Sequence, residues 1–172
     1  MKKKTCIIVD LDSTVCGVKN PQPLPIENTR EQWDIFHKKV KFYHPKTLYP
    51  IKPVIEIIEN FFNKGVYVIF MTAREDCAKG LVRLNSYRFI KKHFKQFSKS
   101  QSFNNDYKII MRQPNDFRSS SEVKQDLLTK CVLPYYNVIM ALDDDENNIQ
   151  MFSNNNILTL KVQDSNDSYK KN

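Results

Sequence analysis

Short apolar runs alternate along the chain with longer segments in which apolar residues recur at helical spacing. The first run, TCIIV at residues 5–9, is nearly continuous, which is typical of a strand covered on both faces. Runs of this kind predict five strands, at residues 5–9, 66–71, 108–111, 137–142 and 157–162. The segments between them predict helices at about residues 29–39, 53–64, 76–97, 119–132 and 146–152.

Two helix boundaries carry terminal signals. Pro53 suits the first turn of a helix, and Gly65 lies just past the expected end of that helix. Ser119 and Glu122 have the spacing of a capping box. Because five apolar strands alternate with helices, the pattern predicts an α/β fold: a Rossmann-like, parallel five-stranded sheet with helices on both faces.

The connection at residues 17–50 interrupts this alternation. It has no clear period and contains five of the eight prolines. A connection this long inside a compact domain is often functional. We therefore expect one domain over residues 1–162, in which residues 17–50 form an insertion that acts as a small or minimal cap. Residues 163–172 are polar and are expected to be a disordered tail.

Composition limits the cellular setting. The formal net charge of +8 can steer the protein toward phosphate-rich partners, but it says nothing about the fold. No stretch approaches the roughly 18 apolar residues of a transmembrane helix, and a signal peptide would not carry the acids at residues 10 and 12. Four cysteines without a CxxC pair predict reduced thiols and a cytoplasmic protein, and argue against a zinc site built from them: Cys6, Cys16, Cys77 and Cys131.

Polar residues gather where three of the predicted strands end. Asp10 and Asp12 follow the first strand, Thr72 and Arg74 follow the second, and three aspartates at 143–145 follow the fourth. Because ligands bind at the carboxyl ends of the strands in such sheets, we expect these groups to converge on one site. Asp10 and Asp12 point the same way if the chain stays extended between them.

At least three carboxylates in one place repel one another unless a cation lies among them. Oxygen ligands of this kind favour Mg²⁺, which binds a few carboxylates together with water and substrate phosphate. Alternatively, each aspartate is a helix cap or a loop residue, since caps favour Asp. That alternative suits a single aspartate at a strand end better than it suits two acidic groups on different strands.

These strand ends resemble the four motifs of the haloacid dehalogenase superfamily. The segment DLDST at residues 10–14 resembles its DxDxT motif, Thr72 its second motif, Lys124 its third, and Asp143-Asp144 with Asn148 its DDxxxN motif. The motifs occur in the family's order and at its strand positions, over residues 5–162. The resemblance implies a magnesium-dependent phosphatase with a fold of the haloacid dehalogenase type.

The resemblance also implies a role for each position. Asp10 would attack phosphorus and form an aspartyl phosphate. Asp12 would protonate the leaving oxygen and then activate the water that hydrolyses the intermediate, and the presence of this second acid favours a phosphatase over a dehalogenase. Thr72 and Lys124 would hold the phosphoryl oxygens.

The implied magnesium ligands are Asp10, the backbone carbonyl of Asp12, and Asp143, with Asp144 orienting or assisting. The run of three aspartates leaves the alignment of residues 143, 144 and 145 open by one position. Asp143 is preferred because it directly follows the apolar strand and places Asn148 at the spacing of the motif.

A closer resemblance is to the 3′-phosphatase domain of phage-type polynucleotide kinase/phosphatase. Residues 72–75 (TARE) resemble its (T/S)GR-E turn, with Ala73 in place of glycine, and Arg112 ends the third strand as an arginine does in that family. Arg118 precedes Lys124 by six residues, and Arg30 with Trp33 resembles an early arginine–aromatic pair. The substrate-binding set that this resemblance implies is Thr72, Arg74, Arg112, Arg118, Lys124 and Arg30.

Features outside the motifs bear on the size of the substrate. A row of basic residues over 79–99 could follow a polynucleotide backbone, or it is a solvated helix face. Trp33, Phe36, Phe42 and Tyr43 could stack on bases, or they form the small core of a cap. His37 and His44 are interpreted as surface or packing residues, since the mechanism does not need them.

The preferred function is a polynucleotide 3′-phosphatase whose partner is a phosphorylated nucleic-acid end, with DNA and RNA both open. No GxxxxGK[ST] P-loop occurs, so no kinase activity is expected from these residues. One alternative is a small-molecule phosphatase such as a 5′- or 3′-nucleotidase. Another, from a different class, is a non-catalytic nucleic-acid-binding module on a phosphatase fold.

Overall fold

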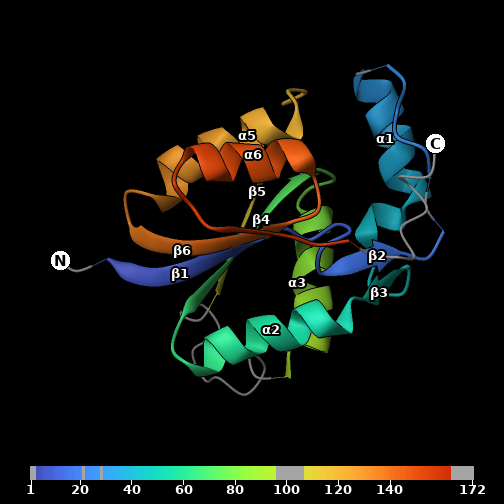
Figure 1. Cartoon of the computed structure of the whole chain (residues 1–172). Coiled ribbons are helices and arrows are strands. Elements are labelled where there is room, and N and C mark those ends of the chain that lie inside the picture. Colours follow the sequence, from blue (N-terminus) through green and yellow to red (C-terminus); the bar gives the residue numbers. More distant parts are fainter. Residues whose placement is uncertain (1–2, 21, 28, 96–106, 164–172) are drawn as a thin grey trace.

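The computed structural model describes residues 3–20, 22–27, 29–95 and 107–163. Its central sheet has five parallel strands in the order β5-β4-β1-β6-β7 (Figure 1). The bounds of these strands are Lys4–Val9 for β1, Tyr67–Glu75 for β4, Tyr107–Arg112 for β5, Tyr136–Asp143 for β6 and Thr159–Lys161 for β7. The predicted Rossmann-like parallel sheet is confirmed.

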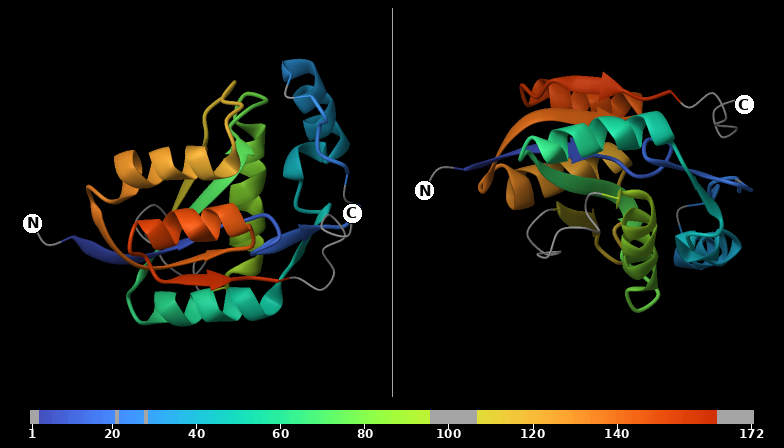
Figure 2. Two further views of the ribbon diagram at one scale, coloured as in Figure 1. Left: turned by 45° about the horizontal axis from the view of Figure 1, so that its top comes forward. Right: turned by 90° about the horizontal axis from the view of Figure 1, so that it is seen from below.

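Helices cover both faces of the sheet (Figure 2). The helices α2 and α3 pack on one face, and α5 and α6 pack on the other. Alternate residues of β1 point to opposite faces of the sheet. Ile7 and Val9 belong to the apolar core on one face, and Cys6 and Ile8 to the core on the other. This alternation explains why residues 6–9 are all apolar. The bounds of these helices are Lys52–Asn63 for α2, Leu81–His93 for α3, Ser120–Leu127 for α5 and Glu146–Asn154 for α6.

The connection between β1 and α2 is built from short elements. It holds β2 (Cys16–Val18), α1 (Arg30–Lys39), the 3₁₀ turn η1 (Lys41–Tyr43) and β3 (Leu48–Pro50). The strands β2 and β3 form an antiparallel ribbon that the sequence did not predict, because strands of three residues are too short to show a period. The ribbon and α1 lie beyond the carboxyl ends of the sheet strands (Figure 1).

Two of the predicted helix boundaries are confirmed. The α5 helix begins with a complete capping box, in which Ser119 and Glu122 bond each other's backbone N–H groups. After α2, Gly65 takes a φ of 76° and its N–H donates to Phe62 O at 2.9 Å, which ends the helix and turns the chain toward β4. The α5 helix continues as a π-helical segment, η2 (Leu128–Val132).

The start of the third predicted helix is wrong by five residues, since α3 begins at Leu81 and not at residue 76. Ala78, Lys79 and Gly80 have φ values of 53°, 54° and 79°, which a right-handed helix does not allow. The predicted end, at residue 97, lies outside the described residues. The second strand is longer than predicted, because β4 continues to Glu75.

Two further findings concern the thiols and the membrane. All four cysteines lie in the described part of the chain and are free thiols. Among the helices that the structure describes, none combines the length and the apolar character needed to cross a bilayer.

Candidate active site

The acidic groups of the first and fourth predicted strands meet at one point. The strands β1 and β6 are neighbours, with Val9 opposite Leu142, and the N–H of Asp10 donates to Leu142 O at 2.9 Å. This junction is the switch point of the sheet, because β4 and β5 lie on one side of β1 while β6 and β7 lie on the other. The predicted convergence of Asp10 with Asp143 at the carboxyl edge is therefore confirmed.

Lys124 lies between the two carboxylates. Its Nζ is 2.7 Å from Asp10 Oδ1 and 2.7 Å from Asp143 Oδ2, and the side chain is only 1% exposed. Burial opposes the charge of Lys124, but Asp10 and Asp143 outweigh it and raise the pKa of the ammonium above its ordinary value. Lys124 is therefore a fixed positive charge beside Asp10, placed there by the helix that begins at the Ser119 capping box.

Asp143 is held through both of its oxygens. While Oδ2 accepts from Lys124, Oδ1 accepts from Asn148 Nδ2 at 2.9 Å and from the N–H of Asp145 at 3.1 Å. Asn148 Nδ2 also lies 3.2 Å from Ser120 Oγ, which ties α6 to α5. These bonds leave the Asp143 carboxylate little freedom to rotate.

The structure distinguishes the members of the aspartate run. Asp145 caps α6, since its Oδ1 accepts from the N–H groups of Asn147 at 2.9 Å and Asn148 at 3.1 Å. The alternative explanation of strand-end aspartates as helix caps thus applies to Asp145. Asp143 and Asp144 remain as the acids that face Asp10.

Asp10, Asp143 and Asp144 form an oxygen-rich cluster. Each offers a carboxylate oxygen, and these atoms lie within 4.8 Å of one another. Burial is the main cause that raises the pKa of Asp10 well above its ordinary value; Lys124 opposes this rise, while Asp143, Asp144 and Asp12 add to it. Asp10 and Asp143 are buried and Asp144 is partly exposed, and such a cluster of hard oxygen donors suits a divalent cation of the magnesium type. The Asp12 side chain is not part of the cluster, and its backbone carbonyl stays a predicted ligand.

Arg74, which was predicted to bind substrate phosphate, is bonded to Asp12. Its Nε donates to Asp12 Oδ2 at 2.8 Å and its Nη2 to Asp12 Oδ1 at 2.7 Å. The Arg74 side chain is 1% exposed, and its guanidinium donates to Ser86 Oγ at 2.9 Å and lies over the Tyr43 ring at 4.1 Å from the ring centroid. Burial opposes the charge, yet Asp12 and the other neighbours raise the pKa of Arg74 above its ordinary value. In this state the arginine positions the second acid.

A bulge in β4 produces this geometry. The pairing with β5 is interrupted between Thr72 and Glu75, so that Ala73 and Arg74 leave the ladder. Thr72 Oγ1 accepts from the N–H of Arg74 at 3.1 Å, which leaves the hydroxyl proton able to point into the pocket. Arg112 stabilises the bulge, since its Nε donates to Ala73 O at 2.8 Å.

The other predicted arginines are also bonded within the protein. Arg112 Nη1 donates to the backbone carbonyls of Asp116 at 2.7 Å and Arg118 at 2.6 Å. Arg118 binds Asp116 bidentately and Asp126 at 2.9 Å, and its hydrogen bonds lower the pKa of Asp116 to about 2. Arg30 is paired with Asp34 and Glu75. Binding of substrate by these three arginines stays a prediction, and it requires them to share or exchange their present partners.

Eight of the ten predicted site residues line one pocket of about 700 Å³, and Arg30 and Asp143 are the two that do not. Its floor carries Asp10, Asp12, Thr72 and Lys124, and Arg112 and Arg118 line it from the segment around the end of β5. Another wall comes from the connection between β1 and α2 and includes Trp33, Phe36, His37 and Tyr43.

The aromatic residues of this wall are packed, as one of the two interpretations of the sequence proposed. Phe36 and Tyr43 belong to the buried core, and Trp33 and Phe42 pack against it. The rings of Trp33 and Phe36 meet edge to face with centroids 5.5 Å apart. Trp33, Phe36 and Tyr43 nevertheless line the pocket, so these packed rings are also part of the site.

Several residues of the site carried no sequence signal. Tyr43 and Ser86 support Arg74 from positions 31 residues before it and 12 residues after it along the chain, and no local pattern links them to it. Thr14 Oγ1 lies 3.4 Å from Asp144 Oδ1, although the DxDxT motif had named this threonine without a role. His37 is buried, as the packing interpretation expected, and its Nε2 lies 3.4 Å from Glu75 Oε2.

Comparison with protein families shows the family to which the chain belongs. The family model described as the phosphatase domain of polynucleotide kinase PNKP, of the haloacid dehalogenase type, matches residues 4–166. No curated protein matches the sequence.

Solved structures share the fold. A chain of the Pnkp1/Rnl/Hen1 RNA repair complex superposes with a TM-score of 0.70 at 20% identity, over 94% of this chain and 43% of that chain. The class C acid phosphatase from Bacillus anthracis gives 0.54 at 13% identity, over 96% and 68% of the two chains. The D,D-heptose 1.7-bisphosphate phosphatase from B. bronchiseptica gives 0.51 at 16%, over 90% and 78%. The chain spans less than half of the two Pnkp1/Rnl/Hen1 chains that it matches, at 43% and 46% of their lengths.

Replacing Lys124 tests the charge balance of the site. In Lys124→Ala, Asp10 and Asp143 face each other without the ammonium, so we expect the free energy of unfolding at neutral pH in EDTA to fall by about 3 kcal/mol. The loss shrinks at acidic pH, because Asp10 has a raised pKa and its protonation removes the repulsion. Urea unfolding of the variant and the wild type at several pH values measures this.

The matched control for this experiment is Lys130→Ala on η2, because the Lys130 side chain is 70% exposed and pairs with Asp126. An exposed pair of this kind contributes little, so a change within about 0.5 kcal/mol is expected. A Lys124→Ala variant as stable as this control would contradict the proposed charge balance.

Proposed function

Because the chain belongs to the family of the phosphatase domain of polynucleotide kinase PNKP and is thus a phosphatase of the haloacid dehalogenase type, we propose that it removes 3′-phosphates from polynucleotide ends. One observation carries the chemistry of this proposal. Lys124 bridges Asp10 and Asp143 at the floor of a pocket in which Arg74 holds Asp12.

In the first step, an oxygen of Asp10 attacks phosphorus, and the bond from phosphorus to the 3′ oxygen breaks. Asp12 gives its proton to the departing oxygen, and an aspartyl phosphate remains on Asp10. In the second step, Asp12 takes a proton from the attacking water, whose oxygen bonds to phosphorus as the bond to Asp10 breaks. Arg74 donates to both oxygens of Asp12, so it has to release one of them for that oxygen to give or take a proton.

Lys124 and Thr72 stabilise the phosphoryl group in this scheme. The Lys124 ammonium is fixed beside the attacking oxygen, where it favours the ionised form of Asp10 and the negative charge that develops on the phosphoryl oxygens. The Thr72 hydroxyl lines the same pocket and can donate to one of those oxygens.

Mg²⁺ is the proposed cofactor, held by Asp10, Asp143, Asp144 and the backbone carbonyl of Asp12. The cluster of carboxylate oxygens within 4.8 Å fits a small hard cation. When bound, Mg²⁺ supplies positive charge that favours ionised Asp10 and offsets the charge of the phosphate. A relative in fold, the D,D-heptose 1.7-bisphosphate phosphatase, was solved with magnesium and phosphate.

Three features favour a nucleic-acid end as substrate. The family is that of a polynucleotide kinase phosphatase domain, and a relative in fold occurs in an RNA repair complex. A pocket of about 700 Å³ with aromatic and arginine walls has room for a terminal nucleotide next to the phosphate. The net charge of +8 favours a polyanion.

The basic row over residues 79–99 is the proposed track for the rest of the strand. Arg83 in this row is paired with Asp76 and also donates to Ile109 O, which makes it structural. Lys79, Arg88, Lys91, Lys92 and Lys95 are exposed, and residue 99 lies outside the described residues.

The covalent mechanism predicts that Asp10→Asn loses turnover and keeps its fold. The amide has nearly the shape of the carboxylate but cannot attack phosphorus, so we expect phosphate release to fall at least about a thousandfold. Steady-state release of phosphate, with circular dichroism to check the fold, measures both. The control is Glu56→Gln, the same type of change on an exposed face of α2, and near-normal activity of Asp10→Asn would refute the mechanism.

The contact between Arg74 and Asp12 predicts which kinetic constant changes in Arg74→Ala. If the arginine positions Asp12, kcat falls by roughly 100-fold or more while KM changes little, and Arg74→Lys does not restore it because lysine cannot bind both oxygens. If Arg74 instead binds substrate phosphate, KM rises. Lys64→Ala, at an exposed position just after α2 and outside the basic row, is the control and keeps both constants.

A panel of phosphate esters tests the substrate. We expect kcat/KM to be higher for 3′-phosphorylated oligonucleotides than for 5′-phosphorylated ones and for 3′-mononucleotides, and the advantage of the oligonucleotides to decline as salt increases. EDTA abolishes turnover, and Mg²⁺ restores it. Indifference to chain length at every salt concentration would favour the alternative of a small-molecule nucleotidase.

A further inference from the structure

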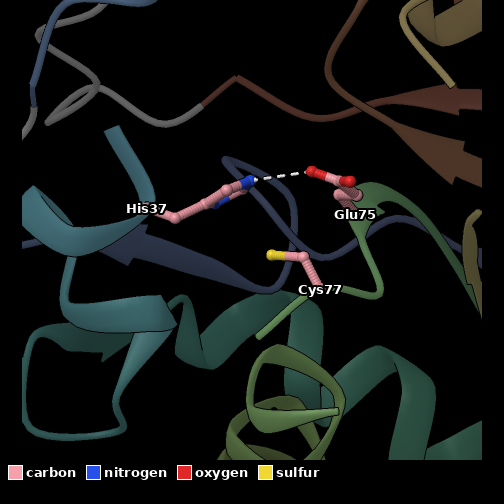
Figure 3. A group of neighbouring side chains, drawn as sticks. All are labelled: His37, Glu75 and Cys77. Atoms are coloured by element: carbon pink, nitrogen blue, oxygen red, sulfur yellow. Dashed lines mark ion pairs between the residues drawn. The ribbon is translucent and has the colours of Figure 1, made fainter. Parts of the chain in front are cut away.

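A second group of potential metal ligands lies beside the proposed active site. It consists of His37 on α1, Glu75 at the end of β4 and Cys77 in the turn that follows (Figure 3). A ring nitrogen, a carboxylate oxygen and the sulfur of these residues lie within 4.8 Å of one another, and all three side chains are buried. In Figure 3 they point toward one another from the cap helix on one side and the sheet edge on the other.

The imidazole of His37 lacks the hydrogen-bond partners that a buried ring normally has. Its exposed fraction is 1%, yet neither ring nitrogen has a hydrogen-bond partner among the described residues. The contact of 3.4 Å between Nε2 and Glu75 Oε2 is an ion-pair distance that fails the geometry of a hydrogen bond. An unsatisfied buried polar group costs about 1–3 kcal/mol, so something favourable is expected to offset it.

Only one carboxylate oxygen of Glu75 faces this group of residues. Its Oε1 accepts from Arg30 Nη1 and from the N–H of Asn115, whereas Oε2 faces His37. The positive charge of Arg30 lies on the outer side of the Glu75 carboxylate and partly compensates its negative charge. A cation on the inner side would therefore meet one carboxylate oxygen, one imidazole nitrogen and one sulfur.

We propose that His37, Glu75 and Cys77 form a binding site for a divalent transition-metal ion of the zinc type. Nitrogen and thiolate ligands select such ions over Mg²⁺, so this site differs in chemistry from the oxygen cluster at Asp10. Tetrahedral zinc with bond lengths of about 2.0–2.3 Å places its ligand atoms roughly 3.2–3.8 Å apart. The present spacing of up to 4.8 Å needs a contraction of about 1.5 Å at most.

The site would join the cap to the sheet. His37 belongs to the connection between β1 and α2, while Glu75 and Cys77 belong to the end of β4, so a shared ion fixes α1 against the catalytic edge. His37 and Glu75 also line the pocket of the proposed active site, which leaves the fourth ligand position to a water on that side.

Cobalt provides a readout that does not depend on phosphatase activity. Titration of Co²⁺ into the full chain, with Mg²⁺ in excess to occupy oxygen-only sites, is expected to give one equivalent of a complex with a thiolate-to-cobalt charge-transfer band. Zn²⁺ displaces the cobalt and removes the band. Cys77→Ser loses the band, and His37→Gln binds Co²⁺ at least about 100-fold more weakly.

Cys131→Ser is the matched control, because Cys131 is a free thiol on η2 outside the ligand group and should leave the band unchanged. Zn²⁺ raises the Tm of the wild type and of this control but not that of Cys77→Ser. Absence of a band in the wild type, or a band of equal strength in Cys77→Ser, overturns the proposal. If circular dichroism shows that Cys77→Ser does not fold, His37→Gln becomes the deciding variant. Wild-type cobalt affinity in His37→Gln would then overturn the proposal.

Discussion

The buried ammonium of Lys124 between Asp10 and Asp143 is the interaction on which the site depends. Two adjacent parallel strands deliver acids to the same point, and uncompensated carboxylates would repel each other there. Burial raises the pKa of Asp10, Lys124 opposes this rise and the nearby acids add to it, so the pKa remains above its ordinary value. The cluster of Asp10, Asp143 and Asp144 has more acids than this one lysine, and its oxygen ligands suit a divalent cation.

Arginines around this centre serve mainly to hold other groups in place. Arg74 fixes the Asp12 carboxylate, and Arg112 gathers three backbone carbonyls so that the bulge in β4 and the loop after β5 keep their shape. Guanidinium groups suit this use because they donate in several directions from one rigid plane. Asp12 and the end of β4 are thus held in place by contacts within the protein, and Arg30 extends the same arrangement to the cap through Glu75.

Prediction from the sequence succeeded where structure follows from local pattern. The central strand at residues 5–9 is apolar at every position that two cores bury, and the capping box at Ser119 consists of residues three apart. It failed where the backbone departs from periodic structure. The ribbon of β2 and β3 is too short to show alternation. The helix expected from residue 76 begins only at Leu81, because the three residues before it have positive φ.

The sequence by itself determined the sheet, the order of its strands along the chain and the appearance of acids at the ends of the first and fourth strands, because periodicity and motif spacing are local properties. Only the tertiary structure decided which partner each charged group has. In the tertiary structure Asp145 caps a helix, Arg74 pairs with Asp12, and His37 lies next to Glu75, which is 38 positions away along the chain. Such pairings depend on distances between separate elements, and those distances exist only after the helices and the cap have packed on the sheet.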